Sequence, residues 1–274
     1  AEIGLILKLI FNIKLIFDFR GLWVDERVDK GGWNINNPID KFQYKIWKYK
    51  ERILLKYCDQ LIILTKKVLP EVKRLGAYPE GKITIIPCCA DYNHFRIFAE
   101  SSKRTIKSDL DIPLKTVVLG YLGSVGSMYR PDAYLELLKI YQKINYMTFG
   151  LVVTPDKEIF NNIMKEKCTK EQIKSIKILA AEREKIPKLI ACMDLLVAFT
   201  NPSYAKISMS PTKLGEAFAT GVPVLCNSGV GDVENLINEI GAGLVIPNLS
   251  SNSLNIAASK IKSLIEINKK DIRT

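Results

Sequence analysis

The residues best suited to chemistry lie in the segment 208–216, which reads Ser-Met-Ser-Pro-Thr-Lys-Leu-Gly-Glu. Ser210 is a good N-cap residue, and Pro211 suits the first position of a helix. A helix that begins here would present free backbone N–H groups and the positive end of its dipole, and both attract anions. Lys213 adds a positive charge to the first turn, where it opposes the dipole but suits a diphosphate.

One face of this predicted helix carries three different functional groups. Thr212, Lys213 and Glu216 fall within about 100° of one another around the helix axis, so a hydroxyl, a cation and a carboxylate lie together. The carboxylate suits the hydroxyl groups of a sugar or a ribose, whereas Leu214 and Phe218 point toward the core. An ordinary capped helix with solvated charges has the same pattern, so the residues leave both interpretations open.

A glycine-rich turn is the second candidate. Residues 120–126 read Gly-Tyr-Leu-Gly-Ser-Val-Gly and stand between a predicted strand and a predicted helix. Glycines there allow backbone N–H groups to approach a phosphate or a sugar. The spacing is neither Gly-x-Gly-x-x-Gly nor that of a Walker A loop, which disfavours a dinucleotide-dependent oxidoreductase. A simple tight turn is the other interpretation of this segment.

The third candidate, residues 18–26, follows the first predicted strand. Asp18 and Arg20 can form a structural ion pair, or they can face a binding site together with Trp23. The residue types are compatible with both. His94 is the only histidine of the chain, and we expect it to be a loop residue rather than a ligand or a base.

The length and composition indicate the kind of protein that positions these residues. A chain of 274 residues, 47% hydrophobic and 25% charged, fits two soluble globular domains and excludes disorder, collagen-like repeats and a disulfide-stapled miniprotein. The net charge of +11 is spread evenly, with 17 basic and 12 acidic side chains in residues 1–100 and 23 and 17 in the remainder. This balance favours anionic partners such as phosphates or an acidic membrane surface and disfavours nucleic acid, which usually needs clustered basic residues.

The cysteines and the first residues exclude further classes. The six cysteines form no Cys-x-x-Cys pair, so we expect no metal site and a reducing, cytoplasmic compartment. The first 17 residues are apolar, but Lys8, Asn12 and Lys14 interrupt them, so no membrane-spanning run forms. We expect a buried helix followed by a strand here.

Short apolar strands alternate with amphipathic helices along the whole chain. Strands are predicted at 15–19, 61–65 and 82–87, and, after a polar boundary stretch at 101–115, at 116–123, 151–155, 176–179, 195–200, 223–227 and 242–246. Helices are predicted at 39–57, 67–76, 131–145, 156–167, 185–193, 211–220, 232–239 and 252–267. This alternation predicts an α/β fold of two Rossmann-like parallel-sheet domains, of which the first is incomplete. Ligands of such sheets bind beyond the carboxyl ends of the strands, where the three candidate segments lie.

The motifs resemble glycosyltransferase family 4, retaining enzymes with the GT-B fold. The resemblance is carried by FDFRGLWVDE (17–26), IIPCCADYNHF (85–95), GYLGSVGSMYRPD (120–132) and SPTKLGEAFATGVPVLCNSGVGDVENLI (210–237). It implies an acceptor-side domain over residues 1–95 and a nucleotide-sugar donor domain over residues 96–274. Two complete domains of this kind need a longer chain, so we expect further sequence before Ala1 and a first domain without its initial strands. A chain of this extent can be inactive by itself.

The resemblance also implies roles for individual residues. Gly123 and Ser124 would lie near the donor diphosphate or the transferred sugar, and Ser210, Thr212 and Lys213 would hold the diphosphate. Glu216 resembles the second glutamate of the family's Glu-x7-Glu motif, which binds the ribose, and Ser208 stands where the first glutamate is expected. Arg130 is the nearest counterpart of the family's basic pair, with Lys206 and Lys213 as further sources of charge. Residues 180–184 would lie near the base, and Asp18, Arg20 and Trp23 on the acceptor side.

The implied reaction is transfer of a sugar from a nucleotide-diphosphate donor to a glycan or lipid-linked acceptor with retention of configuration. Lys213 and Glu216 are the catalytic candidates, and the resemblance implies neither a cofactor nor a metal. We expect a cytoplasmic protein, with peripheral association with an anionic membrane. Two alternatives remain: a non-catalytic nucleotide-sugar-binding protein, and another GT-B enzyme such as a nucleotide-sugar epimerase. An epimerase would need histidine and carboxylates, and this chain has a single histidine.

Overall fold

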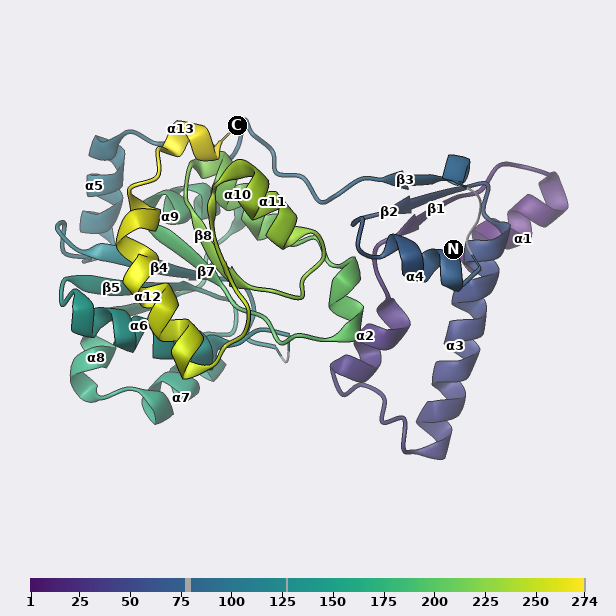
Figure 1. The fold of residues 1–274 in the computed structure, drawn as a ribbon, viewed down its shortest axis with the longest axis horizontal. Coiled ribbons are helices and arrows are strands. Elements are labelled where there is room, and N and C mark those ends of the chain that lie inside the picture. The colour runs from purple at the N-terminus through teal and green to yellow at the C-terminus, as the bar shows by residue number, and fades with distance from the viewer. Residues whose placement is uncertain (77–79, 127, 274) are drawn as a thin grey trace. The chain divides into compact units, whose positions relative to one another are not determined.

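The chain forms two compact units, which Figure 1 shows with their elements labelled. The structure is a computed structural model that describes residues 1–76, 80–126 and 128–273. Unit 1 comprises Ala1–Cys88, Pro202–Ser210 and Gly229–Val233, and unit 2 comprises Cys89–Asn201, Pro211–Ser228 and Glu234–Thr274. Two short segments of the second half of the chain, 202–210 and 229–233, therefore cluster with unit 1.

Unit 1 is built on a three-stranded parallel sheet. The strands β1 (Ile16–Phe19), β2 (Gln60–Ile63) and β3 (Ile83–Ile85) overlap the three predicted strands and lie in that order. The helices are α1 (Glu2–Phe11), α2 (Trp23–Asp29), α3 (Pro38–Tyr57) and α4 (Leu69–Arg74), with the short 3-10 helices η1 (Glu80–Lys82) and η3 (Tyr204–Ser208). Phe19, Leu55, Leu61 and Ile63 are among the buried residues of its core.

Hydrogen bonds hold the two returning segments in unit 1. The Thr65 hydroxyl donates to the carbonyl of Ile207 at 2.7 Å, and the Ser208 hydroxyl accepts from the Leu22 N–H at 3.0 Å. The Asp232 carboxylate accepts from the N–H groups of Lys66 and Lys67, at 2.5 and 3.0 Å. Ala205 also packs in the core of the unit. The loops that follow β1 and β2 thus contact residues that lie more than 140 positions later in the sequence.

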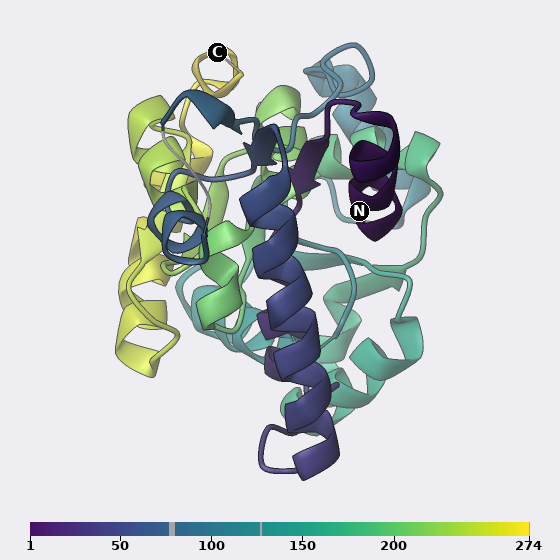
Figure 2. The ribbon, with the colours of Figure 1, turned by 90° about the vertical axis from the view of Figure 1, so that its right-hand side faces the viewer.

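Helix α1 differs from its prediction. It is a helix, but none of its residues is buried, and Ile3, Leu9, Ile10 and Phe11 are exposed. It lies along the C-terminal half of α3 (Figure 2), where Glu2 pairs with Lys50 at 3.0 Å and Lys8 with Asp59 at 2.7 Å. The prediction of a buried helix was wrong because polar contacts, rather than burial of its apolar side chains, attach it to unit 1. Over the described residues, no helix is both long enough and apolar enough to cross a membrane.

Unit 2 is built on a six-stranded parallel sheet. Its strands are β4 (Val117–Leu122), β5 (Thr148–Val153), β6 (Ile176–Leu179), β7 (Leu195–Ala198), β8 (Val224–Asn227) and β9 (Gly243–Ile246). The spatial order β6-β5-β4-β7-β8-β9 reverses direction between β4 and β7. Such a sheet binds ligands beyond the carboxyl ends of the strands at this reversal. The predicted complete Rossmann-like sheet is therefore present.

Helices cover both faces of this sheet. On one face α6 (Pro131–Ile144), α7 (Lys157–Lys167) and α12 (Ser251–Ile265) pack with Leu119 and Tyr121 of β4 in one core. Side chains alternate along a strand, so Gly120 points to the other face, where it allows Met193 to approach β4. That face carries α5 (Glu100–Asp109), α9 (Ile186–Cys192) and α10 (Thr212–Thr220). The remaining elements are η2 (Arg183–Lys185), α8 (Lys170–Lys174), α11 (Val233–Ile240) and α13 (Lys269–Ile272).

The polar stretch 101–115, predicted as a boundary, forms most of α5. Lys103 and Lys107 are buried there although the helix is polar overall. The Lys103 ammonium lies 2.5 Å from an Asp194 carboxylate oxygen, and Lys107 donates to the carbonyl of Thr116 at 2.7 Å. Because both lysines have partners inside unit 2, the stretch packs against α9 rather than serving as an exposed linker.

Candidate functional site

The start of α10 is the centre of the candidate site in unit 2. The helix begins at Thr212 with Pro211 as its N-cap, and no side chain caps it. The prediction that Ser210 is the cap is wrong, because the Ser210 hydroxyl instead accepts a hydrogen bond from the Cys88 N–H at 3.1 Å within unit 1. An uncapped helix start retains the N–H groups and the dipole end that favour an anion.

Lys213 links α10 to the glycine loop that follows β4. Its ammonium donates to the carbonyl of Leu122 at 2.9 Å and lies 3.9 Å from the centre of the Tyr129 ring. Gly123 has a φ of +125°, and a side chain there would meet the Lys213 ammonium at 3.2 Å. Two segments that the sequence marks separately, and that lie 91 positions apart at this contact, are thus brought together at the carboxyl end of β4.

Two hydrogen bonds fix the conformation of the glycine loop. The Tyr121 hydroxyl donates to the Ser124 carbonyl at 2.7 Å, and the Asp156 carboxylate accepts from the Val125 N–H at 2.8 Å. Burial raises the pKa of Tyr121, so this phenol stays protonated as the donor. Sequence reasoning missed Asp156, which follows β5 and fixes the loop. Ser127, within the motif 120–132, lies outside the described residues.

Glu216 lies one turn along α10 and has a cationic partner. Its side chain is only 4% exposed, and its carboxylate lies 2.5 Å from the guanidinium of Arg183, which is 56% exposed. Arg183 also stacks over the Phe95 ring, with 4.8 Å to the ring centre. Arg183 falls in the segment 180–184 that the family resemblance places near the base, but no sequence signal singled out this arginine. The ion pair gives the buried Glu216 carboxylate a partner of opposite charge.

The Arg130 guanidinium forms an ion pair with Asp132. Its guanidinium makes two hydrogen bonds to the Asp132 carboxylate, at 2.8 and 2.7 Å, at the start of α6. This contact is the main cause of the lowered pKa of Asp132. The geometry is the bidentate one that arginine prefers with carboxylates. The structure thus brings Gly123, Thr212, Lys213 and Glu216 together on unit 2, whereas Arg130 is held by Asp132.

Ser208, at the position of the family's first glutamate, is a buried residue of unit 1. Its hydroxyl accepts from the Leu22 N–H at 3.0 Å and donates to the Ala205 carbonyl at 2.6 Å. Gly21 has a φ of +147°, and a side chain there would meet the Ser208 hydroxyl at 3.0 Å. The serine therefore joins η3 to the loop after β1.

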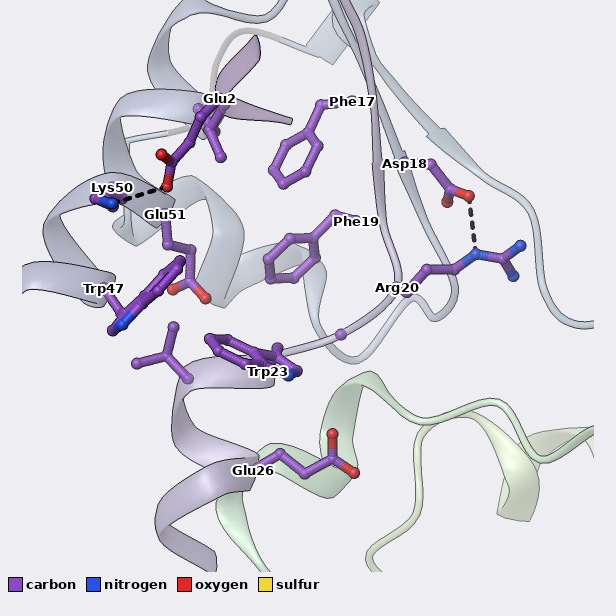
Figure 3. Close-up of a pocket in the computed structure, with 13 residues that line it drawn as sticks. Glu2, Phe17, Asp18, Phe19, Arg20, Trp23, Glu26, Trp47, Lys50 and Glu51 are labelled. Atoms are coloured by element: carbon purple, nitrogen blue, oxygen red, sulfur yellow. Dashed lines mark ion pairs between the residues drawn. The ribbon is translucent and has the colours of Figure 1, made fainter. Parts of the chain in front are cut away.

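The three residues predicted on the acceptor side line one cavity in unit 1, of about 360 Å³ (Figure 3). Phe17 and Phe19 point into it from β1, while Asp18 and Arg20 point to the opposite side and pair at 2.8 Å. Trp23 and Trp47 meet edge to face, with ring centres 5.3 Å apart. The remaining lining residues are Glu2, Gly21, Val24, Glu26, Lys50, Glu51 and Leu54. The cavity therefore presents mainly aromatic and aliphatic surface, and charged side chains, among them the buried Glu51, also line it.

Comparison with known proteins identifies the fold. No known family model and no curated protein matches the sequence. Among solved structures, HepE of Anabaena in complex with UDP-glucose matches with a TM-score of 0.67 and 14% identity, over 99% of this chain and 68% of that chain. WaaG, a glycosyltransferase involved in lipopolysaccharide biosynthesis, matches with a TM-score of 0.63 and 19% identity, over 78% and 57%.

A solved structure of a single domain also matches. The C-terminal domain of a group 1 family glycosyltransferase, LpcC of Francisella tularensis, matches with a TM-score of 0.50 and 18% identity, over 67% of this chain and 95% of that domain. These matches confirm the predicted structural resemblance: the chain has the GT-B fold of the group 1, or family 4, glycosyltransferases, with a smaller first sheet. The chain spans 57% of the WaaG chain and 68% of the HepE chain.

Proposed function

We propose that this protein is a retaining glycosyltransferase that takes a sugar from a nucleotide-diphosphate donor, with UDP-sugars as the first candidates. The observation that carries the proposal is the meeting of Lys213 with the Leu122 carbonyl and Gly123 at the start of an uncapped helix. The fold supports it, since a solved protein of this fold is in complex with UDP-glucose. Unit 2 would hold the donor, and unit 1 would hold a glycan or lipid-linked acceptor.

The diphosphate would lie at the start of α10. Backbone N–H groups in the first turn, the Thr212 hydroxyl and the Lys213 ammonium are all suited to phosphate oxygens. The loop at Gly123 and Ser124 would approach the transferred sugar, because a glycine lets a ligand come close to the backbone. The phosphate-binding groups come from the start of α10, whereas Gly123 and Ser124 lie in the loop after β4. Both segments belong to unit 2, so its sheet fixes the distance between them.

The chemistry would depend mainly on electrostatic stabilisation. As the bond from the anomeric carbon to the β-phosphate oxygen breaks, negative charge grows on the leaving diphosphate, and the helix dipole and Lys213 stabilise it. The acceptor hydroxyl attacks from the side that the diphosphate leaves, so configuration is retained. The two closely spaced carboxylates of a retaining hydrolase are not required.

Glu216 would bind the ribose hydroxyls. A carboxylate can accept hydrogen bonds from two neighbouring hydroxyls, and the ion pair with Arg183 would orient it. Arg183 itself is more than half exposed and can contact the base or a phosphate while it stays close to Glu216. We further propose a cytoplasmic location with peripheral association with an anionic membrane, in line with the net charge of +11.

One observation favours a second candidate function, a nucleotide-sugar-binding protein without transfer activity. Ser208 replaces the glutamate expected at its position, and both the Leu22 N–H and the Ala205 carbonyl already occupy its hydroxyl. A contact from this position to the donor sugar is then lost, while the diphosphate and ribose groups are retained. Such a protein would bind a nucleotide sugar without turning it over.

A donor-turnover assay separates the two functions. The full chain is incubated with a panel of UDP-, GDP- and ADP-sugars, and release of the nucleoside diphosphate is followed with and without added glycan and lipid-linked acceptors. Release that requires Lys213 supports the transferase. Saturable binding of a donor that is never turned over supports the binding protein, and a chain that binds no donor contradicts both.

A further inference from the structure

Lys206 is a buried cation for which the protein supplies little compensation. It lies in η3 within unit 1 and is 3% exposed. Its ammonium contacts the thioether sulfur of Met209 at 3.7 Å, and thioether sulfur is a weak acceptor. Among the residues that the structure describes, no carboxylate forms an ion pair with it. Burial lowers its pKa, and the charges of Glu26 and Asp29 act from a distance in the opposite direction, whereas Lys30 adds to the lowering.

The other buried lysines show what a structural role requires. Lys103 lies 2.5 Å from Asp194, and Lys107 donates to the carbonyls of Thr116 and Leu114, at 2.7 and 3.4 Å. Each of these ammonium groups thus has strong acceptors inside unit 2. A buried charge without such acceptors is costly, so the position of Lys206 points to a counter-charge that comes from a ligand.

A cavity of about 160 Å³ adjoins Lys206 within unit 1. Arg20, Gly21, Ser208 and Ser210 also line it, together with Leu22, Glu26, Leu64, Ala205 and Met209. Glu26 is already paired with Lys30 at 2.9 Å, and Arg20 is 70% exposed and paired with Asp18 on its outer side. The Ser208 hydroxyl already accepts one hydrogen bond and donates another, so the groups left for a ligand are Lys206, Arg20 and the Ser210 hydroxyl. These groups match the chemistry of a phosphate group.

This cavity is next to the aromatic cavity of Figure 3. Arg20, Gly21 and Glu26 line both of them. The larger cavity, of about 360 Å³, presents Phe17, Phe19, Trp23 and Trp47. Unit 1 therefore offers an apolar compartment and, across the loop after β1, a cationic one. A ligand that fills both needs a phosphate at one end and an apolar chain at the other.

We propose that unit 1 binds an amphiphile with this composition, a phosphate attached to an apolar chain, with the phosphate at Lys206 and Arg20 and the chain against Trp23 and Trp47. The proposal rests on the proposed function in one respect, since the amphiphile would be the acceptor or its carrier. A neutral glycan stacked on the two tryptophans is the rival occupant of the aromatic cavity, but it leaves Lys206 without a counter-charge.

The tryptophans provide a direct signal. The three tryptophans of the chain, Trp23, Trp33 and Trp47, all lie in unit 1, and Trp23 contacts both of the others. The full chain is titrated with n-decyl phosphate below its micelle concentration, with n-decanol, with inorganic phosphate and with maltotriose, while tryptophan emission is followed. We expect decyl phosphate to act at a concentration at least tenfold lower than any of the other three. Equal effects of decanol and decyl phosphate, or a stronger effect of maltotriose, overturn the proposal, as does the absence of any response.

Variants locate the phosphate. Lys206→Met is expected to remove the tenfold advantage of decyl phosphate over decanol, Lys206→Arg to keep most of it, and Arg20→Gln to reduce it by several-fold. Lys41→Met, at an exposed position of α3, is the matched control and is expected to change nothing. Because Arg20 is largely exposed, Arg20→Gln keeps the test valid even if Lys206→Met does not fold. An advantage that survives both Lys206→Met and Arg20→Gln contradicts the proposal.

A parallel titration with UDP separates this inference from the proposed function. We expect Lys206→Met to change UDP affinity by less than about twofold. If UDP affinity falls as much as decyl phosphate affinity, Lys206 serves the donor diphosphate and the proposal is overturned. A wild-type chain that binds decyl phosphate as expected but binds no nucleoside diphosphate contradicts the donor assignment and leaves the amphiphile site standing.

Discussion

Lys213 and Glu216 of α10 in unit 2 and Lys206 of η3 in unit 1 differ in how their charges are compensated. In unit 2, Lys213 has the Leu122 carbonyl and the Tyr129 ring, and Glu216 has Arg183. In unit 1, no carboxylate among the described residues pairs with Lys206, whose ammonium contacts the Met209 thioether, and Lys206 lines the smaller cavity that adjoins the aromatic one. The first arrangement is complete without a ligand, and the second is not.

The difference indicates two kinds of ligand. A preorganised set of paired charges around a helix start suits a nucleoside diphosphate, whose charge grows when the sugar leaves. A buried and uncompensated cation beside an apolar compartment suits a ligand that brings its own negative charge and its own apolar surface. Each prediction below changes one side of this comparison, and the predictions run from the largest expected effect to the smallest.

Replacement of Lys213 is expected to have the largest effect. Lys213→Ala removes the positive charge that we propose stabilises the departing diphosphate, and donor turnover should fall by about 100-fold or more, as for other preorganised electrostatic groups. Lys188→Ala, at an exposed position of α9, is the matched control. Turnover that stays within a factor of three of the wild type would remove Lys213 from the mechanism.

Two buried lysines are expected to respond in opposite ways when their charge is removed. Lys107→Met leaves the carbonyls of Leu114 and Thr116 without their donor and should lower the free energy of unfolding by about 2 kcal/mol. Lys206→Met removes a buried charge that pairs with no carboxylate among the described residues, and it should leave this free energy unchanged or raise it. Urea denaturation of both variants provides the comparison. Equal losses would mean that Lys206 is a structural lysine like Lys107.

Removal of the Glu216 carboxylate is expected to weaken nucleotide binding more than folding. Glu216→Ala should lower the affinity for UDP by about tenfold, which corresponds to one charge-assisted hydrogen bond. The affinity for 2′-deoxy-UDP should change less, because one of the ribose hydroxyls is already absent. Calorimetry and melting temperature are measured together. A large fall in melting temperature with unchanged affinity for UDP would assign Glu216 to the structure alone.

The pH dependence of Lys206 gives the smallest expected effect. Burial lowers its pKa in the folded chain below the ordinary value near 10.5. As the pH rises from neutral toward 10.5, the folded chain loses this proton before the unfolded chain does, so the unfolded state holds more protons and stability increases. The stability advantage of Lys206→Met over the wild type should therefore shrink as the pH rises. An advantage that grows with pH would contradict the lowered pKa.

The sequence was sufficient for the α/β architecture because short apolar runs mark the strands and a period of 3.6 marks the helices of both units. The long-range pairs were not predictable. Nothing local marks Arg183 as the partner of Glu216, which lies 33 positions away, or Asp156 as the support of the glycine loop. Such contacts depend on which loops the sheet order brings to one edge.

Local rules were wrong where the fold overrides them. Serine is a preferred N-cap residue, but in the structure the Ser210 hydroxyl accepts a hydrogen bond from the Cys88 N–H and does not cap α10. The apolar start of the chain suggested burial, yet α1 remains exposed and is attached by Lys8 and Glu2. The isolation of Lys206 could not be predicted, because a buried lysine without a carboxylate is recognised only from its three-dimensional surroundings.

The most direct test of the central claim is a calorimetric titration of UDP into the full chain, the Lys213→Ala variant and the Lys188→Ala control. We predict saturable binding at one site per chain, at least several-fold weaker for Lys213→Ala and unchanged for Lys188→Ala. Equal affinity of the wild type and Lys213→Ala for UDP, or the absence of saturable binding of UDP, GDP and ADP to the wild type, would contradict the claim that the start of α10 is a nucleoside-diphosphate site.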